Sequence, residues 1–293
     1  MTNAMNAETM IASSAPIHAP GASKTMPVDI PKKGVISVGP ILTPKNSSNM
    51  PNSTTPRRCT FTDFDRIVEC LSLCFSGDPV DAYYTQCDGQ TEEESHKLDI
   101  EIFSYATYVY LLKGRIYTIG DFEGISCWLP PGEEADDWWT ALRSGGWTLP
   151  YKFGKEGRIR YFKEYLPKID EARERHLKPE DAYNVWYLGY LGTLPSARGK
   201  GLSRKLVEHV TNIADKQGLY CYLESTKLTN QVIYERFGFD LRETFYLTRA
   251  ETPVPVQFMI RAPKPNPVKN RRLLEAMMTP PHSPEPECQL MLM

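Results

Sequence analysis

A glycine-bearing turn near residue 200 has the composition of a phosphate-binding site. Arg198-Gly199-Lys200-Gly201-Leu202-Ser203 lies between an apolar run that ends at Thr193 and an amphipathic run that follows it. Glycines permit positive φ and let backbone N–H groups face one concavity. The first N–H groups of a following helix, its dipole, and the charges of Arg198 and Lys200 add to the attraction for an anion. The turn therefore predicts a phosphate or pyrophosphate site, with an ordinary strand-to-helix turn as the alternative.

A strand–helix–strand unit must position this turn. Residues 184–193 predict a buried strand, residues 202–217 carry an apolar stripe at helical spacing, and residues 219–223 predict a second strand. A connection of this length implies parallel strands joined by a right-handed crossover. Around the unit we predict helices over 61–75, 92–110, 155–176 and 230–237, and strands over 116–119, 124–129, 241–247 and 256–260. The fold class is therefore α/β, or α+β with a mixed sheet.

Proline usage divides the chain into one domain and two tails. Most of the 24 prolines lie in residues 1–56 and 262–293, and neither segment has sustained apolar periodicity. Such segments bury too little apolar surface to offset the entropy of ordering, so we predict two disordered tails. Residues 57–261 remain, which is enough for one core. We expect a helical insertion in this domain near 133–180.

Composition argues against several classes of function. The formal net charge is −2 and the tails are slightly basic, so the domain is mildly acidic and lacks the basic stripe of a nucleic-acid-binding protein. No apolar run approaches the roughly 18 residues of a membrane span. The seven cysteines form no C-x-x-C pair, and the five histidines are dispersed. We therefore expect a cytoplasmic protein in a reducing compartment, with nuclear access left open, no nucleic-acid or membrane partner and no metal site.

The order of motifs along residues 186–239 resembles the GNAT superfamily of N-acetyltransferases. The pattern R-x-x-G-x-[G/A] is followed by an amphipathic helix, by a strand that ends in Leu223-Glu224, and by N-x-x-x-Y-E-R-x-G-F from Asn230 to Phe239. Ser203 departs from the usual Gly or Ala, but it is small enough to preserve the amide cradle. Within the superfamily the chain is most similar to the puromycin N-acetyltransferase-like group. That closer match lies in Phe75, Asp78-Pro79, and residues 127–132, 187–192 and 222–225.

This resemblance implies acetyl-CoA as cosubstrate and a mostly antiparallel, mixed sheet whose central parallel pair splays at the cofactor site. The strand end would offer backbone groups to the pantetheine, and the amide of Thr193 would stabilise the oxyanion of a tetrahedral intermediate. Asn230 would bond the pantetheine arm. The pyrophosphate would be held by the turn and the first residues of the helix. The expected cofactor-binding residues are Leu191, Gly192, Thr193, Arg198, Gly199, Lys200, Gly201, Leu202, Ser203, Arg204 and Asn230.

Two side chains are candidates for proton transfer. Tyr234 corresponds to the family's general acid, and a phenol with a reference pKa of about 10 is protonated at neutral pH. Many relatives carry a carboxylate four residues before the position of Thr193, where this chain has Gly189. Glu224 is then the best remaining general base, acting directly or through a water that Tyr187 and Tyr190 could order. The alternatives are a core aromatic for Tyr234 and a structural cap for Glu224.

The acceptor is expected to be an amine. Aromatic and acidic side chains of one segment are candidates for a pocket that attracts a cation, although indoles often pack in cores and acidic runs often face solvent. They are Trp128, Trp138, Trp139, Trp147, Glu133, Glu134, Asp136 and Asp137. We expect direct transfer to a small-molecule primary amine in a ternary complex, without an acetyl-enzyme. A protein N-terminus or lysine as acceptor and a non-catalytic acyl-CoA sensor are the alternatives, and the oligomeric state stays open.

Overall fold

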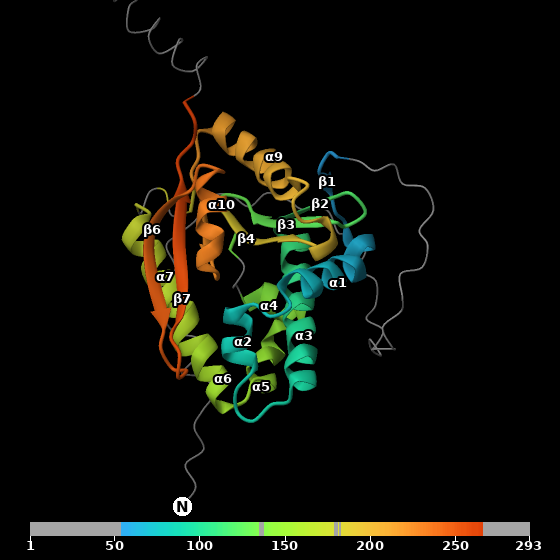
Figure 1. The fold of residues 1–293 in the computed structure, drawn as a ribbon, viewed down its shortest axis with the longest axis vertical. Coiled ribbons are helices and arrows are strands. Elements are labelled where there is room, and N and C mark those ends of the chain that lie inside the picture. Colours follow the sequence, from blue (N-terminus) through green and yellow to red (C-terminus); the bar gives the residue numbers. More distant parts are fainter. Residues whose placement is uncertain (1–53, 135–137, 179–180, 182, 266–293) are drawn as a thin grey trace, which may run out of the picture. The chain divides into compact units, whose positions relative to one another are not determined.

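A computed structural model describes residues 54–134, 138–178, 181 and 183–265. Their strands form one sheet in the order β1-β2-β3-β4-β5-β7-β6 (Figure 1). All neighbouring strands are antiparallel except β4 and β5, which are parallel. The predicted mixed, mostly antiparallel sheet with one parallel pair is therefore confirmed. The strands are β1 (Arg57–Arg58), β2 (Arg115–Ile119), β3 (Gly124–Leu129), β4 (Trp186–Thr193), β5 (Cys221–Ser225), β6 (Asp240–Leu247) and β7 (Val254–Arg261).

Helices cover both faces of this sheet. The α-helices are α1 (Phe64–Phe75), α2 (Pro79–Thr85), α3 (Glu92–Leu112), α4 (Trp138–Ser144), α5 (Leu149–Lys152), α6 (Lys155–Ile159), α7 (Leu166–His176), α9 (Leu202–Gln217) and α10 (Gln231–Glu235). Short turns are η2 (Phe61–Asp63), η3 (Gly146–Thr148), η5 (Pro195–Ala197) and η6 (Leu228–Asn230), and η4 (Arg160–Tyr165) is a π-helical turn. None of the helices in the described ranges is long and apolar enough to span a bilayer.

One helix was not predicted. Pro79 reads in the sequence as a helix breaker after α1, but it occupies the first turn of α2, where a missing N–H costs nothing. The buried Asp78 caps this helix, since its carboxylate accepts a bond from the Val80 N–H at 3.0 Å. Proline and its cap therefore start a new helix instead of a loop. The new helix turns Asp78 toward the interior of the domain.

The two faces of the sheet bury different residues of the same strands. Along β3, Ile125 and Cys127 pack with α1 and α3, whereas Trp128 packs with α9 on the opposite face. The stripe of α9 that includes Leu206 and Val210 is fully buried. This alternation is the period of two expected of a strand covered on both sides. It places the glycine turn before α9 on one side of β4 and the helices α1 to α3 on the other.

The central strands separate beyond their first paired residues. β4 and β5 pair only at Trp186 with Cys221 and at Tyr187 with Tyr222. On its other edge β4 carries a bulge, because Leu188 and Tyr190 oppose successive residues of β3 and Gly189 has no partner. A bulge bends the strand that contains it. The predicted splay of the parallel pair is therefore confirmed.

Candidate active site

The turn before α9 has the backbone conformation that its glycines predict. Gly199 has φ +80° and Gly201 has φ +72°, a region in which other residues are strained. A Cβ built on either glycine would meet no protein atom within 4 Å, so the space beside the turn is open. The helix begins immediately afterwards at Leu202, and its first N–H groups have no acceptor within the helix. The turn therefore combines free donors with room for an anion.

Side chains tie this turn to the end of β4. The hydroxyl groups of Thr193 and Ser203 are hydrogen-bonded at 2.8 Å. Ser203, which is the residue that departs from the family pattern, thus contacts the strand end where the pantetheine is expected. Lys200 forms an exposed ion pair with Glu123 at 2.7 Å. Such a pair contributes about 1 kcal/mol or less, so a bound phosphate could displace Glu123 at small cost.

The strand end itself packs closely on α1. A Cβ at Gly192 would lie 2.6 Å from the Cβ of Cys74, so only glycine fits there. The pKa of the Cys74 thiol is lowered, mainly by its hydrogen bond with Cys70; burial opposes this change, and the positive charge of Arg198 adds to it. Arg198 therefore lies near enough to act on Cys74. The turn, the strand end and α1 meet at one place, as the cofactor site requires.

Tyr234 and Asn230 follow β5 in the chain, on α10 and η6. The Tyr234 ring lies edge-on to Phe237 and Phe239, with centroids 6.3 and 6.2 Å away. Burial raises the pKa of its phenol above the ordinary value, and the negative charge of Asp78 acts in the same direction. The phenol is therefore protonated at neutral pH. Asn230 is half-buried at the start of α10, and its N–H donates to the Lys227 carbonyl at 2.9 Å.

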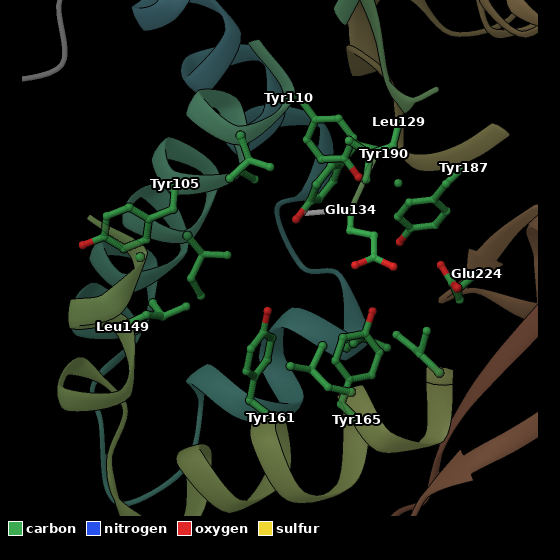
Figure 2. A pocket seen from close by; sticks show the side chains of 18 of the residues that line it. Tyr105, Tyr110, Leu129, Glu134, Leu149, Tyr161, Tyr165, Tyr187, Tyr190 and Glu224 are labelled. Atoms are coloured by element: carbon green, nitrogen blue, oxygen red, sulfur yellow. The ribbon is translucent and has the colours of Figure 1, made fainter. Parts of the chain in front are cut away.

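Glu224 lies on β5 beyond the point where β4 and β5 separate. Its Oε1 atom is buried without a hydrogen-bond partner among the described residues. Burial raises the pKa of the carboxyl to about 7, and the hydroxyl of Tyr187, which points toward it in Figure 2, partly offsets this rise. Tyr187 is held in turn by stacking on Tyr222, with ring centroids 4.7 Å apart. A carboxylate that titrates near neutral pH can accept a proton from an amine.

A cavity of about 530 Å³ opens beside Glu224. In Figure 2 the hydroxyl groups of several tyrosines converge on it, from β4, from α3 and from the helices opposite. The acidic side chains in its wall are Asp78, Asp81, Glu133, Glu134 and Glu224. Burial raises the pKa of Asp81 to about 8, and the charge of the nearby Asp78 adds to the rise. Several carboxyl groups therefore surround a space of small-molecule size, and no group of described residues has the composition of a metal site.

Comparisons with known proteins place this geometry in a family. A family model described as "Acetyltransferase (GNAT) family" matches residues 127–239. An uncharacterized N-acetyltransferase of Schizosaccharomyces pombe is 42% identical over 208 residues, which cover 71% of this chain and 83% of that protein. The chain belongs to the GNAT family of acetyltransferases. This family generally uses acetyl-CoA as acyl donor, and the predicted superfamily is confirmed.

Solved structures share the GNAT fold at lower similarity. A structure from Corynebacterium glutamicum, described as histone acetyltransferase HPA2 and related acetyltransferase, is 25% identical with a TM-score of 0.50, and the match covers 73% of this chain and 98% of that one. A polyamine N-acetyltransferase of Drosophila melanogaster is 15% identical with a TM-score of 0.45, over 71% of this chain and 99% of its own. Likeness at this level concerns the fold and says nothing of the acceptor.

The structure explains why this GNAT protein has glycine where many relatives have a carboxylate. A Cβ at Gly189 would lie 1.8 Å from the hydroxyl oxygen of Tyr110. Tyr110 comes from α3 and is buried, so no longer side chain fits at that point of β4. Among the acidic side chains of the cavity wall, Glu224 is the one that a strand of the parallel pair supplies.

The predicted aromatic wall was right in part. Trp147, Glu133 and Glu134 line the cavity. Trp128 does not, because it is buried against Trp186 on the α9 face of the sheet. Trp139 is exposed outside the cavity wall, whereas the Trp138 side chain, Asp136 and Asp137 lie outside the described residues.

Tyrosines form most of the aromatic wall, and all but two of them were missed. Tyr161 and Tyr165 lie one turn apart, as do Ala106 and Tyr110 on the facing helix. That spacing was a detectable signal. It reads equally well as the packed face of an ordinary core helix.

Proposed function

We propose that this GNAT protein transfers the acetyl group of acetyl-CoA to a primary amine of a small molecule, directly within a ternary complex. The observation that carries the proposal is the cavity of about 530 Å³ that ends at the half-buried Glu224, whose Oε1 atom is buried, beside the splayed strands. Small-molecule sites have volumes of about 300–1,000 Å³. The resemblance to the puromycin N-acetyltransferase-like group also favours a small acceptor, such as a toxic or specialised metabolite.

The turn before α9 fits the pyrophosphate of acetyl-CoA. The amides of residues 199–204 would hold it, with added charge from Arg198 and Lys200. Open space beside both glycines supports this role, since a Cβ on either would meet no atom of the described residues within 4 Å. Leu191, Gly192 and Thr193 would bind the pantetheine through their backbone, and Asn230 would bond its far side. The hydrogen bond between Thr193 and Ser203 keeps these two parts of the site in register.

Three groups of the chain divide the chemistry. Glu224 takes a proton from the ammonium form of the acceptor, and the free amine attacks the thioester carbonyl. The N–H of Thr193 stabilises the negative charge that develops on the carbonyl oxygen. As the tetrahedral intermediate collapses, Tyr234 gives its proton to the departing thiolate. The nitrogen loses its second proton, which restores the Tyr234 phenol through solvent, and Glu224 releases the first proton to solvent, so that an amide and free coenzyme A result. At neutral pH the half-buried Tyr234 phenol is protonated, and the Glu224 carboxyl, with a pKa of about 7, is partly ionised, so each is present in the form that these steps need.

The charges of the cavity favour a cationic acceptor. Five acidic side chains line the described cavity, whereas Arg173 is the basic residue in that lining and Lys227 lies beside it. Lys227 lies 3.8 Å from Asp78, whose carboxylate also accepts a bond from Thr226 at 2.6 Å. Asp81 and Glu224 are left with raised pKa values, which a cation would lower again. An amine that enters as ammonium ion supplies that positive charge.

Release of coenzyme A thiol from acetyl-CoA in the presence of an amine panel tests the proposal. The panel contains small primary amines, a peptide with a free N-terminus and a lysine-bearing peptide with a blocked one. We expect release with small amines, together with the acetylated product by mass spectrometry. Release with the peptides alone would make the protein an acetyltransferase of proteins. Acetyl-CoA binding without release under any condition would make it a sensor.

A further inference from the structure

Two helical faces line opposite walls of the cavity. On α3, Ile102, Ala106 and Val109 are spaced by one turn and line the same wall. On the opposite side the wall is built by Tyr161, Tyr165 and other apolar residues of η4 and α7 (Figure 2). Faces of this composition normally pack against a neighbouring element and bury their apolar surface. Here Ala106, Tyr161 and Tyr165 border the cavity and are only partly buried by the described residues.

The wall opposite α3 is held from behind. Its π-helical turn η4 carries Glu164, a buried carboxylate that accepts bonds from the Thr248 N–H at 2.7 Å and from the Tyr83 hydroxyl. Arg160, at the start of the turn, donates to the Tyr83 carbonyl at 2.8 Å. These bonds fix the back of η4 to α2 and to the segment after β6. Its front therefore presents Tyr161 and Tyr165 to the cavity as a rigid surface, and single π-helical turns of this kind are frequent at functional sites.

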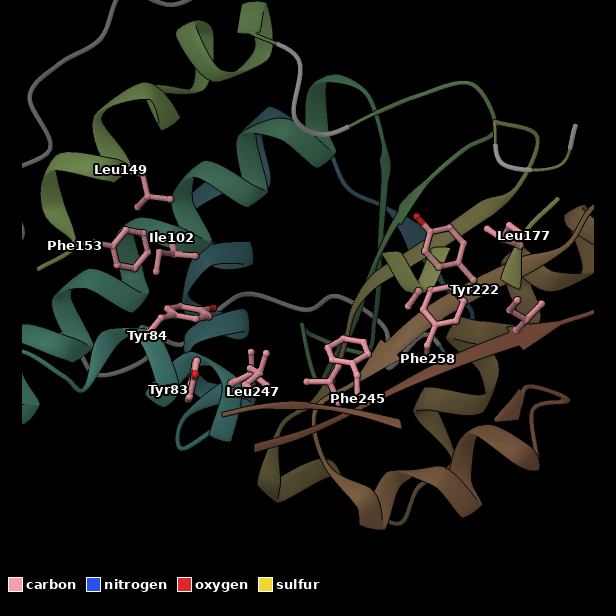
Figure 3. Close-up of a cluster of buried hydrophobic side chains, with 14 of the residues drawn as sticks. Tyr83, Tyr84, Ile102, Leu149, Phe153, Leu177, Tyr222, Phe245, Leu247 and Phe258 are labelled. Atoms are coloured by element: carbon pink, nitrogen blue, oxygen red, sulfur yellow. The ribbon is translucent and has the colours of Figure 1, made fainter. Parts of the chain in front are cut away.

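The cavity differs chemically between its two ends. Figure 2 shows Glu224 at one end and Tyr105 with Leu149 at the other. At that second end Ile102 and Leu149 belong to a buried apolar cluster with Phe153 and Tyr84 (Figure 3). Glu224 therefore offers a carboxyl near the strands, whereas the space between the helices is lined mainly by apolar and aromatic side chains, with the Asp81 carboxyl bonded to the hydroxyl of Tyr84 beside it.

We propose that the space between α3 and η4 is an apolar specificity slot, so that the acceptors are primary amines joined to an aromatic or bulky aliphatic body. The amine lies toward Glu224 and the body lies between Ala106 and the rings of Tyr161 and Tyr165. This inference rests on the proposed function for the reaction itself. It adds the class of acceptor and the segment that selects it, namely η4 with its supporting bonds to Glu164.

A homologous series of amines tests the slot. Activity is measured as kcat/KM for primary alkylamines of increasing length and for amines with a phenyl or indole ring. Each methylene that enters the slot should raise kcat/KM about fourfold, which corresponds to about 0.8 kcal/mol per buried CH₂ group. The rise should stop when the slot is full. Diamines of equal length, which would place a second charge in the slot, should be poorer than the monoamines.

Ala106→Leu provides the matched perturbation, because leucine favours helix and its side chain would enter the slot. It should lower kcat/KM for the longest and ring-bearing amines at least tenfold and leave the shortest amine within about threefold. If Ala106→Leu fails to fold, Ala106→Val adds a smaller side-chain volume at the same position. His96→Leu, at an exposed position of the same helix, should change kcat/KM for neither the long nor the short amines. Coenzyme A binding by calorimetry verifies that each variant is folded.

The outcomes separate the slot from the reaction. Equal kcat/KM along the series, a preference for diamines, or an equal loss for short and long amines in Ala106→Leu would each overturn the slot while acetyl transfer stands. Calorimetry of the same amines without acetyl-CoA measures their affinity for the slot independently of turnover. If affinity rises with length but no amine is acetylated, the slot is upheld and the proposed function is wrong.

Discussion

Replacement of Glu224 by glutamine should stabilise the protein at alkaline pH and remove its activity. The Glu224 side chain is half-buried beside Tyr187, and its buried Oε1 atom has no hydrogen-bond partner among the described residues. Its pKa is raised from 4.5 to about 7 by burial. The folded protein therefore favours the protonated form, which is a feature of a group kept for its chemistry. Glutamine is uncharged at every pH and nearly the same size.

The size of the effect follows from proton linkage. A folded-state pKa above the unfolded value gives stability that is fully present below about pH 4.5 and is lost as pH rises through about 7. For wild type this loss is about 2.5 kcal/mol between about pH 5 and about pH 8, at 1.36 kcal/mol per pKa unit. The Glu224→Gln variant does not have this loss of stability, because glutamine does not titrate. The melting temperature of the variant relative to wild type should therefore rise by roughly 5–10 °C between these pH values.

Thermal unfolding at both pH values, with a parallel pH–rate profile, measures the two effects. Wild-type kcat/KM should fall below about pH 7 as Glu224 is protonated, and the variant should lose about 10²–10⁴-fold in activity together with this limb. Glu69→Gln, at an exposed position of α1, is the control for exchanging a carboxylate for an amide. A variant that loses stability equally at both pH values and keeps its kcat would identify Glu224 as a structural residue and refute the reasoning.

Three further outcomes test other parts of the site. Gly201→Val should weaken acetyl-CoA binding more than tenfold by calorimetry. Gly89→Val, at an equally open glycine of positive φ in a distant loop, should leave the affinity unchanged. Equal affinity in a folded Gly201→Val protein would show that the turn does not bind the phosphates. Tyr234→Phe should lower kcat and kcat/KM together by about 10²–10⁴-fold. A variant with wild-type kcat, under conditions in which chemistry limits the rate, would show that Tyr234 is a structural residue and not the general acid. Residues 57–262 alone should bind acetyl-CoA within about tenfold (roughly 1.4 kcal/mol) of the full chain; a larger loss would give a tail a part in the site.

The sequence predicted the strand–helix–strand unit well because its signals are local. Gly201 and Gly218 bound α9 at φ +72° and +74°, and the apolar stripe between them has one possible orientation toward the sheet. The same holds for β3, whose ends are set by turns. The helix α2 was missed because Pro79 has two local meanings, a breaker after one helix or the first residue of the next. Only the bond from Val80 to Asp78 decides between them.

The walls of the cavity proposed for the acceptor could not be predicted in the same detail, because their contacts join residues that lie far apart in the chain. Tyr110 excludes a side chain at Gly189, and nothing near either residue in the sequence indicates that they meet. The spacing of Tyr161 and Tyr165 predicts an apolar helical face. It does not say whether that face packs against protein or borders a cavity. Glu164, which fixes this face, finds its partners on other elements.

The part of the site that local sequence signals predict differs in function from the part that depends on contacts between distant residues. The groups proposed for acetyl-CoA and for proton transfer lie on consecutive elements from β4 to α10, and they depend on one another through contacts such as that between Thr193 and Ser203. The proposed slot is built by α3 and η4, which touch this unit at its edge. Substitutions in the slot can therefore change which body fits without moving the groups that act on the thioester. Glu224 belongs to both parts, because it ends the cavity and lies on β5. A change of acceptor that keeps the chemistry should accordingly spare Glu224 and vary residues such as Ala106.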